Sequence, residues 1–256
     1  MPRAARQMSG TGIYHVMVRG INKQDIFIEQ EDYLRYLDSL VRVRARSGCH
    51  IHGYCLMSNH VHLLLQAGNE DVGQVMKRIG ASYVRWYNSK YQRVGHLFQD
   101  RFLSEAVEDD TYLLTVLRYI HQNPVKAGLA ADCADYPWSS YPAYISPGMR
   151  ANEVTETAFV LGIYGGVPQF IKSSAVLDDG KMRLEESDPP TDEAVVALVN
   201  SLLAGQAVPT VGMMKKVERD NIIGRLKALG GVTNGQIARL TGLTLSAVQR
   251  AATESE

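Results

Sequence analysis

The chain has 256 residues and equal numbers of basic and acidic side chains, 27 of each, so its formal net charge is zero. This length can bury a sizeable core and suits one ordinary domain plus a smaller one. Its three cysteines have no zinc-type spacing, which argues against a disulfide framework, and no apolar run approaches the roughly 20 residues of a membrane span.

The charge is unevenly distributed along the chain. Residues 77–101 hold six basic residues and one acidic residue, interleaved with aromatic rings, a pattern that suits unpaired nucleic acid. Residues 213–256 hold seven basic and four acidic residues, whereas residues 151–212 hold three basic and nine acidic ones. The two basic regions are candidate polyanion contacts, although either could simply solvate helix faces.

Hydrophobic periodicity predicts the elements in chain order. A strand at 12–19 and a helix at 31–46 come first, followed by two strands at 51–57 and 60–66 across a tight turn. A helix at 71–88, a strand at 103–107 and a helix at 110–122 follow, and Pro124 is expected to stop the last helix. The order βαββαβ plus a helix predicts an α/β (α+β) class with a ferredoxin-like antiparallel sheet.

Two histidines, His60 and His62, stand on one predicted strand. Strand side chains alternate faces, so the two imidazoles point the same way and outline a metal site. A two-residue turn at 58–59 would place Met57 opposite His60 and Cys55 opposite His62. A second pair, His50 and His52, would then project to the other face, and we expect it to have a structural role.

The helix at 110–122 supplies a possible partner for the histidines. Tyr119 and Asn123 lie one turn apart and can reach the same point, so an amide oxygen could complete a metal shell beside a phenol. A tyrosine beside an apolar stripe is more often a packing residue.

Five ordered segments within residues 10–145 resemble a known family: YHVMVRG at 14–20, MSNHVH at 57–62, GHLFQDRF at 95–102, LRYIHQNPVK at 117–126 and YPWSSY at 136–141. They are similar to the tyrosine transposases associated with repetitive extragenic palindromes (REP), in the HUH (His-hydrophobe-His) superfamily of single-strand DNA nucleases and transposases.

The resemblance implies His60 and His62 as metal ligands and Tyr119 as nucleophile. Asn123 falls where insertion-sequence relatives carry a glutamine ligand. Tyr87 and Tyr112 are fallback nucleophiles. Gln99 and Arg101 would either hold the DNA backbone or form a structural turn.

The implied reaction is a metal-dependent transesterification that leaves a 5′-phosphotyrosine link and a free 3′-hydroxyl. Magnesium prefers oxygen ligands while imidazole suits manganese, so either Mg²⁺ or Mn²⁺ is expected as cofactor. A non-catalytic DNA-binding regulator and a phosphodiesterase that uses water are the alternatives.

The C-terminal residues 213–256 are predicted to form three helices, at 217–229, 234–241 and 244–252, that resemble a helix-turn-helix DNA-binding domain. Ser246, Gln249 and Arg250 would face the major groove, unless the helices form a plain bundle or a dimerisation cap. Arg3 and Arg6 are a minor-groove arm or a frayed terminus.

The expected organisation is a catalytic domain at 1–145, an acidic connector with some helix at 146–212, and the helix-turn-helix domain. The partners are single-stranded or hairpin DNA and, through the C-terminal helices, double-stranded DNA, with no membrane, in the cytoplasm at the nucleoid. The candidate DNA-binding residues are Arg3, Arg6, Arg19, Lys77, Arg78, Arg85, Arg101, Ser246, Gln249 and Arg250.

Overall fold

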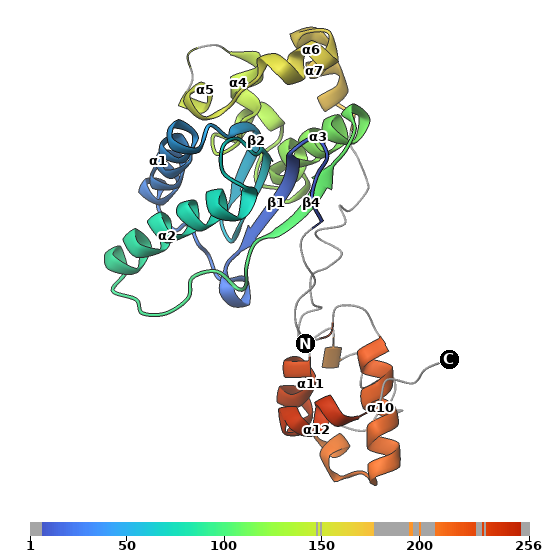
Figure 1. Cartoon of the computed structure of the whole chain (residues 1–256). Coiled ribbons are helices and arrows are strands. Elements are labelled where there is room, and N and C mark those ends of the chain that lie inside the picture. Colours follow the sequence, from blue (N-terminus) through green and yellow to red (C-terminus); the bar gives the residue numbers. More distant parts are fainter. Residues whose placement is uncertain are drawn as a thin grey trace. The chain divides into compact units, whose positions relative to one another are not determined.

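The computed structural model describes residues 7–146, 148, 150–176, 195–196, 200, 208–228, 232 and 234–251. The chain divides into two compact units, Met1–Gly180 and Lys181–Glu256, which Figure 1 shows in blue to yellow and in orange to red. Within the described residues, no helix is long and apolar enough to cross a membrane. The predicted residues Arg3 and Arg6 lie outside the described residues.

The first unit is built on a four-stranded sheet. Its strands are β1 (Ile13–Arg19), β2 (His50–Met57), β3 (His60–Gln66) and β4 (Leu103–Val107), in the order β2-β3-β1-β4, and every neighbouring pair is antiparallel. With α1 (Gln30–Ser47) after β1 and α2 (Val72–Lys90) after β3, this is the predicted ferredoxin-like arrangement. The predicted fold class is confirmed.

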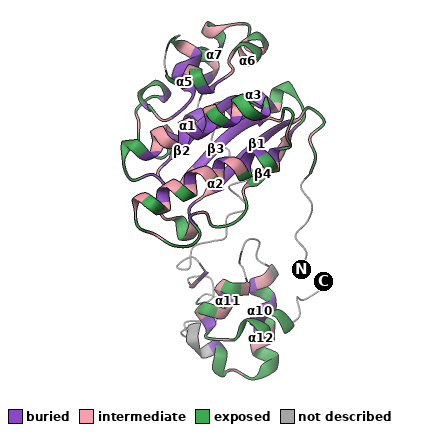
Figure 2. Ribbon diagram, turned by 60° about the vertical axis from the view of Figure 1, so that its left-hand side comes forward, coloured by how far each residue is buried: buried purple, intermediate pink, exposed green. Residues whose placement is uncertain are grey.

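Helices α1 and α2 cover one face of the sheet (Figure 1). Their starts are fixed by acidic caps: Glu29 and Asp32 form a capping box before α1, and the Asp71 carboxylate accepts a hydrogen bond from the Gln74 backbone N–H at the start of α2. The apolar residues of both helices pack on alternate residues of the strands, such as Val16 and Leu63. This buried layer, purple in Figure 2, is the main core.

Helix α3 (Asp110–Lys126) packs on the opposite face of the sheet. Leu117 lies against Gly53 of β2, where an added Cβ would come within 2.5 Å of Leu117 Cδ1. The prediction that Pro124 stops this helix was wrong, because the helix continues to Lys126. A proline in the last turn removes only one helical hydrogen bond, and the chain closes the turn through Ala127 N–H, which donates to the Asn123 carbonyl.

The first unit extends beyond the predicted boundary at residue 145. Helices α4 (Tyr141–Ile145), α5 (Arg150–Val154), α6 (Ala158–Tyr164) and α7 (Val167–Ser174) belong to it. Phe170 of α7 stacks on Tyr144 at 4.6 Å between ring centroids and meets the edge of the His121 ring from α3. Residues 150–176, assigned from sequence to an acidic connector, therefore pack on the first unit. Most of residues 177–207 lie outside the described residues.

Among its described residues, the second unit includes the helices α10 (Lys216–Ala228), α11 (Asn234–Thr241) and α12 (Leu245–Arg250), with a short 3-10 helix at Val208–Met213. Ile237 and Val248 are buried in its core. Gly242 adopts a left-handed φ of 71° in the turn after α11, and the Thr244 hydroxyl accepts a hydrogen bond from the Ala247 N–H to cap α12.

Candidate active site

The candidate site lies on the α3 face of the sheet. In the register of β3 with its neighbours, His60 pairs with Arg19 and Met57, and His62 pairs with Met17 and Cys55. The pairing expected from a two-residue turn is confirmed. The rings of His60 and His62 stand with centroids 5.0 Å apart, nearly perpendicular.

The second histidine pair lies at the far end of the strands and its orientation was predicted wrongly. A bulge between Ile51 and Gly53 resets the alternation of β2, so His52 reaches the side chain of Gln66. His52 Nε2 is 3.1 Å from Gln66 Oε1, and its Nδ1 is 3.3 Å from the Glu156 carbonyl oxygen. These contacts agree with a structural role for this ring.

Tyr119 of α3 lies directly over the histidines. Its ring meets the His62 ring edge-on, with centroids 5.7 Å apart, and is 2% exposed. The Lys126 ammonium lies 5.0 Å from the centre of the same tyrosine ring. Asn123, one turn after Tyr119, is buried and donates its side-chain N–H to the Tyr119 carbonyl at 3.1 Å. An amide that donates from its nitrogen presents its oxygen elsewhere, as a metal ligand requires.

The fallback tyrosines occupy other places. The Tyr87 hydroxyl donates to the Asp25 carbonyl at 3.1 Å, and its ring belongs to the core on the other face of the sheet. Tyr112 lies in the first turn of α3, two turns before Tyr119. The Tyr119 ring contacts the His62 ring edge-on.

Each ring of the first pair forms a side-chain hydrogen bond through Nδ1. His60 Nδ1 is 2.7 Å from Asn59 Oδ1, and His62 Nδ1 is 3.0 Å from Nε2 of His15 on β1. An imidazole that donates from Nδ1 carries its lone pair on Nε2, the form in which histidine binds a metal. His15 was missed from the sequence because its partner is set by strand register, although its position in the YHV segment was a signal.

The site keeps the imidazoles of His15 and His62 neutral. Burial lowers the pKa of His15 to about 3. Burial also lowers the pKa of His62 well below its ordinary value, and His60, His15 and Arg19 nearby add to the effect. Neutral rings are the metal-binding form of histidine.

The side chains around Tyr119 supply neutral donors for a cation. Within the described residues, no three His, Cys, Asp or Glu side chains converge as a ligand cluster. The imidazoles of His60 and His62 and the Asn123 amide oxygen are compatible with Mn²⁺ or Mg²⁺ if substrate oxygens fill the remaining positions.

The predicted single-strand platform at 77–101 is not formed as expected. The rings of Tyr83 and Tyr87 are buried in the core, and Trp86 and Tyr91 pack against it. Lys90 forms ion pairs with Glu29, Glu31 and Asp32. Its ammonium lies 5.0 Å from the centre of the Trp86 ring and 5.1 Å from that of Tyr91, so these rings contact a cation of the same segment.

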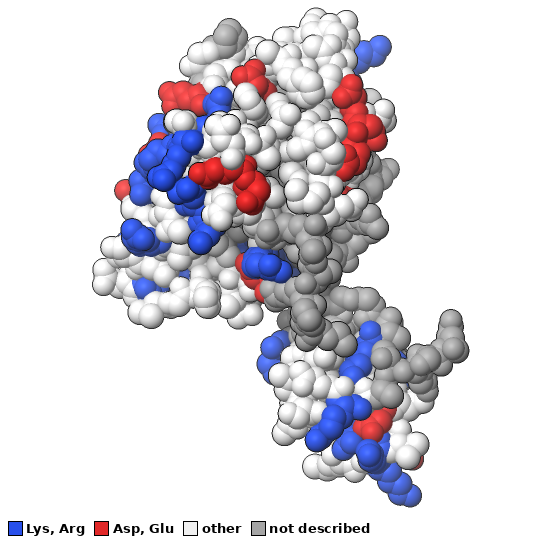
Figure 3. Space-filling view, in the orientation of Figure 1, with Lys and Arg blue, Asp and Glu red and all other residues white. Residues whose placement is uncertain are grey.

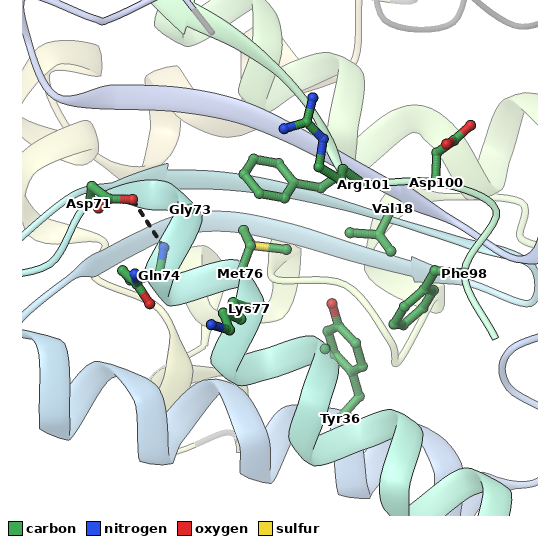
Figure 4. Close-up of a pocket in the computed structure, with 12 residues that line it drawn as sticks. Val18, Tyr36, Asp71, Gly73, Gln74, Met76, Lys77, Phe98, Asp100 and Arg101 are labelled. Carbon is green, nitrogen blue, oxygen red and sulfur yellow. Dashed lines mark hydrogen bonds between the residues drawn. The ribbon is translucent and has the colours of Figure 1, made fainter. Parts of the chain in front are cut away.

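The remaining predicted DNA contacts are spread over the chain. Arg19 ends β1, and Gln99 donates its backbone N–H to the Arg19 carbonyl at 2.9 Å. Arg101 is exposed beside a cavity of about 450 Å³ between α2 and the segment before β4, where Tyr36, Met76 and Phe98 gather (Figure 4). Lys77, Arg78 and Arg85 lie on α2, and Ser246, Gln249 and Arg250 are exposed on α12.

Known proteins match the part of the chain that contains the candidate site residues. The family model described as "Transposase IS200 like" matches residues 9–123, which include both histidines, Tyr119 and Asn123. A putative REP-associated tyrosine transposase of Haemophilus influenzae is 31% identical over 99 residues, 34% of this chain and 56% of the relative. A REP-associated tyrosine transposase of Escherichia coli is 23% identical over 153 residues, 57% of this chain and 88% of the relative.

The chain is similar to REP-associated tyrosine transposases over the part that contains the candidate site. A solved structure of such a transposase bound to a REP hairpin is 18% identical, with a TM-score of 0.50 over 62% of this chain and 96% of the other, and it shares the fold. The match to the Haemophilus transposase covers 56% of that protein, so this chain spans just over half of its length. The family model ends within α3, so helices α4 to α7 lie outside the matched residues.

Proposed function

We propose that the chain is a metal-dependent single-stranded DNA endonuclease and strand transferase with Tyr119 as its nucleophile. The observation that carries the proposal is the contact of Tyr119 with His62, at 5.7 Å between ring centroids, on the sheet face that also holds His60. Similarity to REP-associated tyrosine transposases supports the same reaction class.

In the proposed step, the Tyr119 oxygen attacks a DNA phosphorus. A tyrosine–phosphorus bond forms at the 5′ side while the bond to the 3′ oxygen breaks. The phenolic proton is lost to solvent, and the departing 3′ oxygen takes up a proton as a hydroxyl. Because the phosphodiester energy is kept in the tyrosyl link, a 3′-hydroxyl of another strand can reverse the step and join strands.

The residues of the site have separate tasks in this reaction. His60, His62 and Asn123 would hold Mg²⁺ or Mn²⁺, which when bound would withdraw charge from the phosphate. Asn59 and His15 keep the two imidazoles in the tautomer that presents Nε2. The Lys126 ammonium over the Tyr119 ring favours negative charge on the phenolic oxygen during attack.

The proposed substrates are hairpin-forming repetitive palindromes, in line with the REP hairpin bound by the structurally similar transposase. The C-terminal unit is proposed to read double-stranded DNA through α12, as a helix-turn-helix. Ser246, Gln249 and Arg250 are exposed on that helix and available for base contacts. A cytoplasmic location at the nucleoid would follow from these partners.

The test uses single-stranded oligonucleotides from the region flanking the gene, labelled at either end and incubated with the full chain and Mn²⁺ or Mg²⁺. A 3′ label should shift onto the protein in a denaturing gel, and a 5′ label should appear on a shorter product. Tyr119→Phe should abolish the adduct and leave hairpin binding within about twofold, because only one oxygen atom is removed. Tyr112→Phe is the matched control and should keep the adduct.

Other results would reassign the chemistry. Cleavage without an adduct would identify water as the nucleophile. An adduct that persists in Tyr119→Phe would transfer the role to another tyrosine. DNA binding with no cleavage under any metal would leave a non-catalytic DNA-binding regulator.

A further inference from the structure

A cavity of about 680 Å³ runs between α1 and α2, on the outer side of the helical layer. Its floor contains small side chains, including Ser39 and Ser82, whose hydroxyl oxygens are 3.4 Å apart. Its cations are Arg35, Arg42, Arg46, Lys77, Arg78 and Arg85. We call this feature the α1–α2 groove.

The cations of the groove lie in two rows, one along α1 and one along α2. On α1 the arginines at 35, 42 and 46 have i, i+7, i+11 spacing, and on α2 Arg78 and Arg85 are two turns apart, so each set lies along one side of its helix. Figure 3 shows Lys and Arg gathered on the left-hand side of the first unit, over these two helices. Only the α2 half of this set was recognised from the sequence.

The charge of the α1–α2 groove is largely uncompensated. Arg78 pairs with Glu70 through two hydrogen bonds of 2.8 and 2.9 Å. Arg42, Lys77 and Arg85 are exposed and form no ion pair with another described residue. No carboxylate lines the groove among the residues described. Such a surface is complementary to a dense row of phosphates.

The absence of aromatic rings from the described lining of the groove decides between two forms of DNA. Single strands are held by stacking bases on aromatic side chains, whereas a duplex keeps its bases stacked internally and presents only its backbone. Of the rings on α2, Tyr83 and Tyr87 are buried in the core and Trp86 is partly buried against it, and none of them lines the groove. The α1–α2 groove therefore suits a duplex backbone.

The position of the α1–α2 groove separates it from the candidate active site. Helices α1 and α2 cover the sheet face opposite to the one that holds His60, His62 and Tyr119. From Arg35 to Arg46 the helix rises about 16 Å, a length over which duplex DNA carries about ten phosphates. Nucleotides bound in the groove are thus distinct from those presented to Tyr119.

We propose that the α1–α2 groove binds the sugar–phosphate backbone of a base-paired DNA stem while the opposite face of the same unit receives the unpaired strand. The proposal rests on the proposed function only for the identity of the nucleic acid as DNA. The groove adds no sequence discrimination, since its contacts are to phosphates. The groove distinguishes a base-paired hairpin from a single strand that does not pair.

The test compares a fluorescent DNA hairpin with a non-pairing single strand of equal length, by anisotropy, on the full chain in EDTA. Replacing two phosphate contacts, in Arg42→Gln/Arg85→Gln, should lower the salt slope of hairpin binding by about 1.8. Raising salt from 50 to 200 mM should then weaken binding of the unsubstituted chain about 12-fold more than binding of the variant. Affinity for the single strand should stay within about twofold.

The matched control is Lys172→Gln, an exposed cation on α7 outside the groove, compared with Arg85→Gln alone. An unchanged hairpin slope, or an equal loss in Lys172→Gln, would show that the groove does not hold DNA. Equal losses on hairpin and single strand would overturn the assignment to duplex. Because these measurements contain no metal, a chain that shows the expected slope but forms no tyrosyl adduct would refute the proposed chemistry and leave the groove assignment standing.

Discussion

His15 forms a hydrogen bond with His62, and its replacement should weaken metal binding at the proposed site. The two rings share a hydrogen bond of 3.0 Å between His15 Nε2 and His62 Nδ1, and His15 is fully buried. Two tautomers fit this bond, but only the one in which His62 donates places the Nε2 lone pair toward a cation. His15→Leu removes the acceptor and keeps an apolar side chain in the strand.

Loss of such an outer hydrogen bond costs 10- to 100-fold in metal affinity, or about 1.4 to 2.7 kcal/mol. Titration calorimetry with Mn²⁺ should give this loss of binding free energy for His15→Leu. The loss for His15→Gln should be less than about a third as large, because the amide oxygen of glutamine can accept the same hydrogen bond. Thermal unfolding of both variants checks that the sheet is intact. Equal Mn²⁺ affinity in the two variants would refute the role of His15.

Two further predictions concern α3. Lys126→Gln should slow adduct formation by about 10-fold, because it removes one moderate contact between a charge and the Tyr119 ring, and it should leave hairpin affinity unchanged. Single-turnover reactions on denaturing gels measure the rate. An unaltered rate would show that Lys126 has no part in the reaction. His121 is buried against Ser140 at 2.7 Å and burial lowers its pKa to about 3, so the unfolded chain binds a proton there below pH 6.5 that the folded chain refuses. The free energy of unfolding should therefore decrease as the pH is lowered, by about 2.7 kcal/mol between pH 8 and 4.5 from this group alone. In urea unfolding, the His121→Leu variant should not show this part of the decrease.

The sheet and its helices were predictable because their signals are local. Strand β4 at 103–107 matches its predicted bounds, and the alternation of apolar residues set which face of β3 holds His60 and His62. The tight turn at 58–59 fixed the pairing of β2 with β3 near the site. The same rule failed for His52, because a bulge is a local irregularity that alternation does not reveal.

The missed features depend on contacts between distant segments. His15 meets His62 only through the pairing of β1 with β3, 47 residues apart. The sequence of helix α7 was assigned to a connector on the basis of its composition. In the structure, Phe170 of this helix packs against the rings of His121 in α3 and Tyr144 in α4. The burial of Tyr83 reflects the helical period, which a count of rings and charges over a window ignores.

Helix α3 is held from behind as well as from the sheet, since Gln122 donates to the carbonyls of Ser174 and Val176 at 2.9 and 2.7 Å. The ring of Tyr119 on this helix contacts the His62 ring of the same polypeptide. A lone molecule already contains every protein group the proposed chemistry asks for. Turnover per molecule should for that reason be insensitive to dilution.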